Sequence, residues 1–183
     1  CEVFNNELAA VFAAVPEGRA RRIKMWFKEF LFTAAYTGYF PVASGTAGSL
    51  LGMALYIGAY LIFGAYSWIV NLVFVMVMLY PAVKLGDTAE EYFGVKDPSE
   101  MVLDEVLGYQ ISVLFYPFSW KLAICAFFIF RIIDITKPYP LNRLEDLHGG
   151  LGIVIDDCIA GVYTNFILLA ILVVSNMLGM PVY

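Results

Sequence analysis

The chain has 183 residues, a formal net charge of −5 and 61% hydrophobic residues, well above the roughly 45–50% apolar content of soluble domains. This length suits one domain, and the acidic balance argues against nucleic-acid binding. From Phe30 to Val83 there is no Asp, Glu, Lys or Arg, which favours an all-α integral membrane protein over a very apolar soluble helical domain.

Residues 1–29 are predicted to form an N-terminal amphipathic segment at the membrane interface. Five of the eleven Lys and Arg residues lie there, namely Arg19, Arg21, Arg22, Lys24 and Lys28. Trp26 and Phe27 stand among them, a combination typical of a helix beside anionic headgroups. Residues 30–183 are predicted to form a membrane-embedded domain.

The apolar segments predict a polytopic helical bundle with about four or five membrane-embedded helices. Residues 47–66 and 68–84 are separated by a short turn and would form an antiparallel hairpin. Residues 106–117 and 120–135 are a shorter apolar pair, and residues 158–178 are the final span. The segment 30–40 is too short to span and is expected to lie in the interface or to pack on the protein.

The charge distribution predicts which polar segments meet. If the basic N-terminal segment stays in the cytoplasm, as the positive-inside rule favours, both hairpins return to that side. Segments 84–105 and 134–157 would then lie at one membrane face, together with every acidic cluster and the glycine-rich run at 148–157.

Two pairs of adjacent carboxylates, Asp104-Glu105 and Asp156-Asp157, precede apolar segments. Acids in a first helical turn are favoured by the macrodipole alone, so helix capping is one explanation for either pair. Two pairs at one face favour a divalent cation, because neighbouring carboxylates repel unless they are neutralised. Without clustered Cys or His ligands, the site suits Mg²⁺ rather than Zn²⁺, with Glu91 and Asp97 as further candidate ligands.

Cationic and small residues supply candidate phosphate contacts. Arg131 and Asp134 either satisfy each other, or Arg131 holds a phosphate together with Lys137. His148 is a candidate phosphate ligand, general acid or loop-holding residue, and its role stays open. The segment Gly45-Thr46-Ala47-Gly48-Ser49 precedes a helix, where backbone N–H groups can receive an anion, although small residues also serve close helix packing.

Together these motifs resemble those of the bacterial phosphatidylglycerophosphatase A family. They follow the family's order from about residue 38 to the end: Gly45-Thr46-x-Gly48-Ser49, Asp104-Glu105 followed by Gly108, Phe130-Arg131-Ile132-x-Asp134, Lys137-Pro138-x-Pro140, and His148-Gly149-Gly150-x-Gly152-Ile153 with Asp156-Asp157-x-x-Ala160-Gly161. Ser44 departs from the family, whose members usually have proline there.

The resemblance implies a Mg²⁺-dependent phosphatase of the bacterial inner (cytoplasmic) membrane, with its active site on the cytoplasmic face. Its lipid substrate would be phosphatidylglycerol phosphate, which loses its terminal phosphate. The residues expected to carry the reaction are Asp104, Glu105, Arg131, Asp134, Lys137, His148, Asp156 and Asp157, with a phosphate-binding contribution from Gly45, Thr46, Gly48 and Ser49.

Three questions stay open at this point. An Asp could be a covalent nucleophile instead of a metal ligand. A transporter or channel with Arg131 and Asp134 as an intramembrane charge pair, and a lipid-binding protein without catalysis, are alternatives from other functional classes. The sequence does not determine the oligomeric state.

Overall fold

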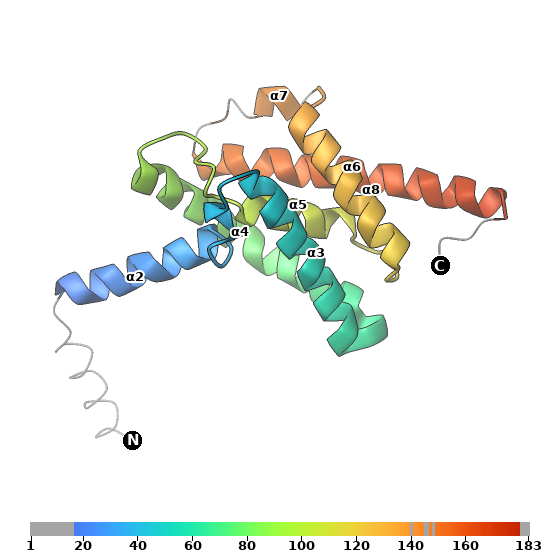
Figure 1. Ribbon diagram of the computed structural model, residues 1–183, viewed down its shortest axis with the longest axis horizontal. Helices are drawn as coiled ribbons and strands as arrows, with labels where there is room; N and C mark the ends of the chain where they lie inside the picture. Colours follow the sequence, from blue (N-terminus) through green and yellow to red (C-terminus); the bar gives the residue numbers. More distant parts are fainter. Residues whose placement is uncertain (1–16, 140, 145–146, 148, 180–183) are drawn as a thin grey trace, which may run out of the picture.

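A computed structural model describes residues 17–139, 141–144, 147 and 149–179 (Figure 1). These residues form helices and turns, with no strand among them, so the predicted all-α class is confirmed. The helices are α2 (Glu17–Phe32), α3 (Ser44–Phe63), α4 (Ser67–Phe93), α5 (Leu103–Ser112), α6 (Trp120–Thr136), α7 (Leu141–Leu144) and α8 (Gly150–Met177), with short 3-10 turns η1 (Thr37–Tyr39) and η2 (Gly64–Tyr66).

Two segments are long and apolar enough to cross a membrane. The first, Ser44–Phe93, contains α3, η2 and α4, and the second, Gly150–Met177, is α8. Both expose large hydrophobic side chains, such as Met76 and Phe166, on their outer surfaces, which suits contact with lipid. These two segments indicate a membrane protein. The presence of four or five membrane-embedded helices stays a prediction.

The helices α3 and α4 pack against each other on either side of η2. Gly64 ends α3 at φ 55°, a left-handed backbone that glycine adopts without steric cost. Beyond the apolar part, α4 continues to Phe93, further than the predicted end near residue 84, and Gly94 terminates it at φ 70°. The acidic residues Asp87, Glu90 and Glu91 therefore lie on α4 and not in a loop after it.

The helix α8 begins at Gly150, well before the predicted start near residue 158. Asp156 and Asp157 consequently lie inside the helix, and the explanation that this pair caps a helix is wrong. A carboxylate of α4 caps the N-terminus of α8 instead, because the Gly150 amide donates to Asp87 Oδ1 over 2.8 Å. This contact needs glycine on both helices, since a Cβ on Gly86 would lie 2.6 Å from the Gly150 Cα.

The short helix α5 lies at the centre and packs against α3, α4, α6 and α8. Gly108 allows α8 to come close, because a Cβ there would lie 2.7 Å from the Asp157 carbonyl oxygen. Asn165 of α8 satisfies the buried end of α5, and its side-chain amide donates to the carbonyls of Ile111, Ser112 and Leu114. The last carbonyls of a helix have no partner within that helix and need one elsewhere. This contact with α8 therefore fixes the position at which α5 ends.

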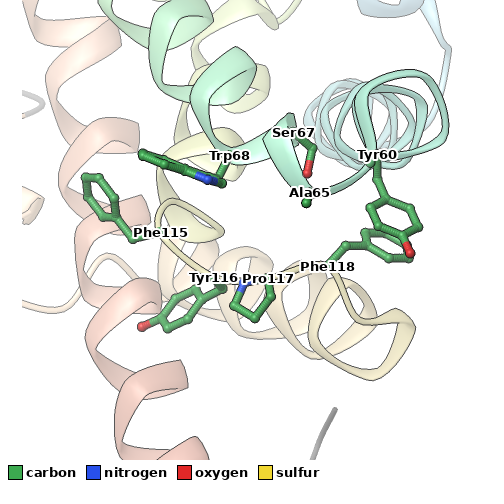
Figure 2. A pocket seen from close by; sticks show the side chains of 9 residues that line it. Tyr60, Ala65, Ser67, Trp68, Phe115, Tyr116, Pro117 and Phe118 are labelled. Atoms are coloured by element: carbon green, nitrogen blue, oxygen red, sulfur yellow. The ribbon is translucent and has the colours of Figure 1, made fainter.

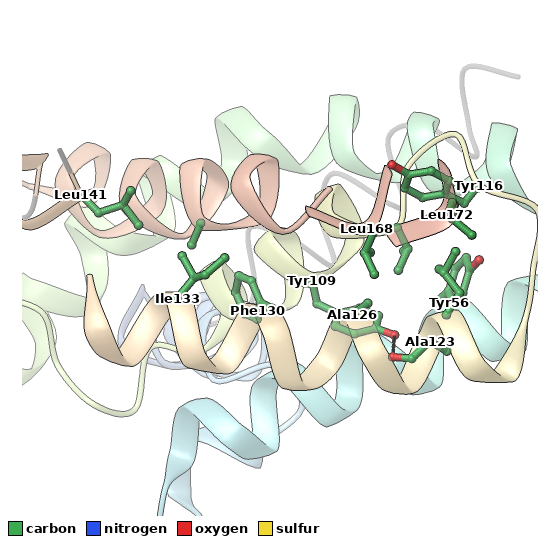
Figure 3. Close-up of a cluster of buried hydrophobic side chains, with 13 residues drawn as sticks. Tyr56, Tyr109, Tyr116, Ala123, Ala126, Phe130, Ile133, Leu141, Leu168 and Leu172 are labelled. Atoms are coloured by element: carbon green, nitrogen blue, oxygen red, sulfur yellow. Dashed lines mark hydrogen bonds between the residues drawn. The ribbon is translucent and has the colours of Figure 1, made fainter. Parts of the chain in front are cut away.

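A buried cluster joins α5, α6 and α8 (Figure 3). Tyr109, Phe130 and Leu168 are almost completely buried in it. The Tyr109 hydroxyl donates to the Ala123 carbonyl over 3.0 Å, the dashed line in Figure 3. This packing holds α5 and α6 in a defined orientation, and these helices carry Asp104, Glu105 and Arg131.

The helix α2 meets the bundle only at its C-terminal end. Phe32 is buried and its ring lies 5.9 Å from that of Phe93, so this part of segment 30–40 packs on the protein, one of its two predicted positions. Ile23, Trp26 and Phe27 stay exposed. The interfacial position of residues 1–29 stays a prediction.

Candidate active site

Most of the predicted charged residues line a single pocket of about 410 Å³. The start of α3, the loop before α5, the start of α5, the end of α6 and the first turns of α8 surround it. The sequence-predicted residues among its lining are Gly45, Asp97, Asp104, Glu105, Arg131, Asp134, Lys137, Asp156 and Asp157. The structure thus brings together both carboxylate pairs and the three charged residues Arg131, Asp134 and Lys137.

Three of the carboxylates form a compact cluster. One carboxylate oxygen from each of Asp104, Glu105 and Asp157 lies within 4.8 Å of the others. Asp104 and Asp157 are only 5% and 4% exposed. In addition, Asp104 Oδ1, Glu105 Oε2 and Asp157 Oδ1 are buried without a hydrogen-bond partner. Buried polar atoms left unpaired are costly, and a hard cation with oxygen ligands would satisfy all three.

The charged forms of Asp104 and Glu105, the two acids at the start of α5, are disfavoured in this pocket. Burial, and then the negative charges of Glu105 and Asp157, raise the pKa of Asp104 well above its usual value. Burial is also the main reason that the pKa of Glu105 rises to about 7. The charged forms therefore need a compensating positive charge in this pocket, beyond that of the nearby Arg131.

The two cations of the pocket each hold one carboxylate. Arg131 Nη1 lies 2.7 Å from Asp134 Oδ2, and Lys137 Nζ lies 2.8 Å from Asp156 Oδ2. Arg131 and Asp134 therefore pair with each other, as one of the two sequence interpretations has it, but both also line the pocket, and Arg131 Nε is buried without a hydrogen-bond partner. These pairs leave Asp104, Glu105 and Asp157 as the carboxylates of the pocket with unpartnered oxygens.

The glycine-rich segment meets the pocket at one residue. Gly45 lies against Glu105 and Arg131, and a Cβ there would be 3.0 Å from Arg131 Nη1. The amides of Thr46 and Ala47 already donate to the Ala43 carbonyl, so in this turn only the amides of Ser44 and Gly45 remain as candidates for an anion.

The other small residues of this segment have packing roles. Gly48 packs on Val102, and the Ser49 hydroxyl donates to the Gly45 carbonyl over 2.9 Å. Ser49 Oγ also receives a long hydrogen bond of 3.5 Å from Arg131. Thr46 is not among the residues that line the pocket.

Three residues around the pocket have left-handed backbones without being glycine. Their φ angles are 55° for Ala43, 50° for Asp97 and 39° for Lys137. Such conformations cost about 1–2 kcal/mol for an L-residue and tend to occur at functional sites. Ala43 and the apolar lining residues Ile135 and Ile153 were not singled out by the sequence, because nothing in an alanine or isoleucine marks a pocket position.

Four predicted residues, Thr46, Gly48, Ser49 and Glu91, are not among the described residues that line the pocket. Glu91 is exposed on α4 and does not line it. His148 lies outside the described residues. Asp87, four residues before Glu91 on α4, caps α8 through Gly150. A neighbouring glycine on each helix was the sequence signal for that close contact.

A larger cavity of about 700 Å³ lies at the other end of α3 and α5 (Figure 2). Aromatic side chains, including Tyr60, Trp68, Phe115 and Phe118, line it, and none of its lining residues is Asp, Glu, Lys or Arg. The candidate chemistry therefore belongs to the smaller, acidic pocket.

Comparisons with known proteins find relatives along most of the chain. The family model described as phosphatidylglycerophosphatase A matches residues 30–172. Proteins named phosphatidylglycerophosphatase A from Escherichia coli K12 and Haemophilus influenzae are 34% identical over 151 residues and 32% identical over 137 residues. These alignments cover 80% and 74% of this chain, and 85% and 82% of the relatives.

A Bacteroides thetaiotaomicron protein with the provisional name phosphatidylinositol-3-phosphatase is 37% identical over 141 residues, which cover 74% of this chain and 86% of that protein. No solved structure matches the chain. The match to the family model and the extent of these alignments establish that the chain belongs to the phosphatidylglycerophosphatase A family.

Proposed function

We propose that this protein is a lipid phosphatase that hydrolyses the terminal phosphomonoester of phosphatidylglycerol phosphate, releasing phosphatidylglycerol and inorganic phosphate. Its family membership supports the reaction. The observation that carries the proposal is the set of three unpartnered, buried carboxylate oxygens on Asp104, Glu105 and Asp157. They form the kind of anionic oxygen cluster on which metal-assisted phosphate chemistry depends.

The residues present fit Mg²⁺ as the cofactor. Asp104, Glu105 and Asp157 would hold the ion, with Asp97 and Asp156 close enough to act directly or through water, since all five line the pocket. Neither Cys nor His is among the described lining residues, which favours a hard cation over Zn²⁺. A bound Mg²⁺ supplies charge neutralisation at phosphoryl oxygens and a water of lowered pKa.

The cations and the α3 turn would hold the phosphate. Arg131 offers a planar fork of donors that matches phosphate oxygens, and Lys137 offers a point charge. Asp134 and Asp156 orient these two side chains through their ion pairs. The amides of Ser44 and Gly45 would add neutral donors at the start of α3. The route through a covalent Asp intermediate remains an alternative for the same residues.

The proposed position in the cell is the bacterial inner membrane, with several membrane-embedded helices and the acidic pocket on the cytoplasmic face. The basic residues around α2, including Arg22, Lys24 and Lys28, support this orientation through the positive-inside rule. Lys28 donates to Thr88 of α4, which puts the basic helix near the polar end of α4.

The distribution of polar groups argues against a transporter or channel. A transport path would need polar side chains along the spans, whereas the buried or half-buried charges of α6 and α8 line the acidic pocket, namely Arg131, Asp134, Asp156 and Asp157. The side-chain amides of Asn71 and Gln110, which are buried, and of Asn165, which is half-buried, donate to backbone carbonyls, so their donors already have structural partners.

The test is phosphate release by the detergent-purified protein, with Mg²⁺ or with EDTA, on phosphatidylglycerol phosphate and on phosphatidylinositol 3-phosphate. The second lipid is included because of the name of the Bacteroides relative. We expect Mg²⁺-dependent release, fastest with phosphatidylglycerol phosphate. Faster turnover of the inositol lipid would retain the chemistry and replace the substrate.

The site assignment is tested with Asp104→Asn and Asp157→Asn. Losing one essential metal or phosphate contact should lower turnover by roughly 10²–10³. Glu91→Gln is the matched control, because it neutralises an exposed carboxylate outside the pocket. Turnover at the wild-type level in folded Asp157→Asn protein would contradict the assignment.

A further inference from the structure

The rim of the acidic pocket includes apolar as well as polar residues. Asp97 and Ser99 of the loop before α5 are exposed and line the pocket. Ala43, just before α3, and Ile135, near the end of α6, also line it and are exposed, with Ile135 at 71%. A ligand at the mouth of this pocket therefore contacts polar and apolar surface at the same time.

The apolar part of the rim continues away from the pocket along α6 and along the segment before α3. On α6, Phe128 and Ile132 are each 60% exposed. Ile132 lies four residues after Phe128 and three before Ile135, a spacing that puts all three on one helical face. Before α3, Val42 is 72% and Phe40 is 61% exposed. The helices α3 and α6 contact each other and run side by side in Figure 1.

We infer that the rim of the acidic pocket between residues 40–43 and the Ile132–Ile135 end of α6 is a lateral portal for the substrate. This inference rests on the proposed function and adds the route by which a membrane lipid reaches the site. The phosphomonoester enters the acidic pocket, and the glycerol backbone and acyl chains stay on the apolar rim. The occupant is a lipid because the apolar surface is continuous with the pocket at Ile135, so only a ligand with both characters contacts the whole surface.

A route through the polar rim alone would make a different prediction. A water-soluble phosphomonoester needs only Asp97, Ser99 and the charges behind them, and the apolar rim would then contact bulk lipid without affecting substrate binding. The two cases separate when one active site is offered a long-chain lipid and a short-chain, water-soluble analogue with the same phosphate.

The experiment compares Ile135→Asn with Ile62→Asn in the purified full chain. Ile62 lies near the other end of α3 and is 76% exposed, so its substitution matches the loss of lipid-facing apolar surface. The substrates are dioleoyl phosphatidylglycerol phosphate in mixed micelles and its dibutyryl analogue in solution. We expect Ile135→Asn to raise the KM for the long-chain lipid roughly tenfold more than the KM for the dibutyryl analogue, the effect of losing most of one aliphatic contact.

The portal is overturned if Ile135→Asn and Ile62→Asn have the same KM for the long-chain lipid, or if Ile135→Asn impairs both substrates equally. Val42→Asn, with Val77→Asn on the exposed face of α4 as its control, repeats the test on the other side of the mouth should Ile135→Asn fail to fold. Absence of phosphate release from either substrate by the wild-type protein would instead refute the proposed function.

Discussion

Gly45 allows the stability of the fold to be separated from the geometry of the site. It lies in the first turn of α3, and a methyl group on it would overlap Glu105 Oε1 and approach the Arg131 guanidinium to 3.0 Å. Gly58 lies in the same helix, and a methyl group there would meet nothing within 4 Å. Gly45→Ala and Gly58→Ala thus add the same atom to one helix, once inside the pocket and once outside it.

The expected magnitudes follow from what the methyl group touches. The atoms it would displace at Gly45 are the ends of two flexible side chains, so the fold can adapt, but Glu105 must move by about 1 Å to restore ordinary contact. A misplacement of that size costs about 10²-fold in rate. Gly58→Ala removes a glycine from a helix interior, which stabilises the helix by up to about 1 kcal/mol, and leaves the site untouched.

The assay measures Mg²⁺-dependent phosphate release and thermal unfolding of both variants in the same detergent. We expect Gly45→Ala to lose about 10²-fold in kcat with little change in unfolding temperature, and Gly58→Ala to keep its activity and unfold slightly later. The reasoning is refuted if Gly45→Ala keeps wild-type kcat, or if its activity falls only because the protein unfolds.

Three further predictions concern stability. Asp87→Ala removes the acceptor of the Gly150 amide and should cost about 1 kcal/mol, whereas Asp87→Asn keeps an acceptor and should unfold near the wild-type temperature; equal losses would exclude the capping role. Asn165→Ala removes the side-chain donor to the Ser112 and Leu114 carbonyls and should cost about 1–3 kcal/mol, while Asn176→Ala on the exposed end of α8 should cost almost nothing in the same melt. Burial raises the pKa of Glu105 from 4.5 to about 7, so between these values the folded protein without metal binds a proton that the unfolded chain releases. EDTA-treated protein should therefore lose thermal stability as the pH rises from about 5 to about 7, and Mg²⁺ should reduce that loss; a flat pH profile would contradict the assigned burial.

The helical class and the acidic character of the pocket could be predicted from the sequence because both depend on residue types. A charge-free run from Phe30 to Val83 leaves the backbone few structures other than membrane helices. Adjacent carboxylates and a paired Arg and Lys likewise indicate cation and phosphate chemistry wherever they meet. The topology argument also brought segments 84–105 and 134–157 to one end of the bundle.

The helix boundaries could not be predicted in the same way, because they depend on contacts between distant residues. Gly150 has a poor helix propensity, yet α8 starts there because Gly86 lets α4 come close and Asp87 accepts its amide. The end of α5 similarly depends on Asn165, more than fifty residues later in the chain. Local sequence carries no record of either partner.

Membership of the pocket was also decided by the tertiary structure. Asp97 and Glu91 are both acids of the same polar segment, but only Asp97 lines the pocket, while Glu91 lies on the exposed face of α4. The sequence by itself determined a membrane helical protein with carboxylates suited to a metal. Packing of α3, α5, α6 and α8 decided which carboxylates are buried together. The burial of these carboxylates and the repulsion between them depend on distances between helices, which are short only in the folded protein.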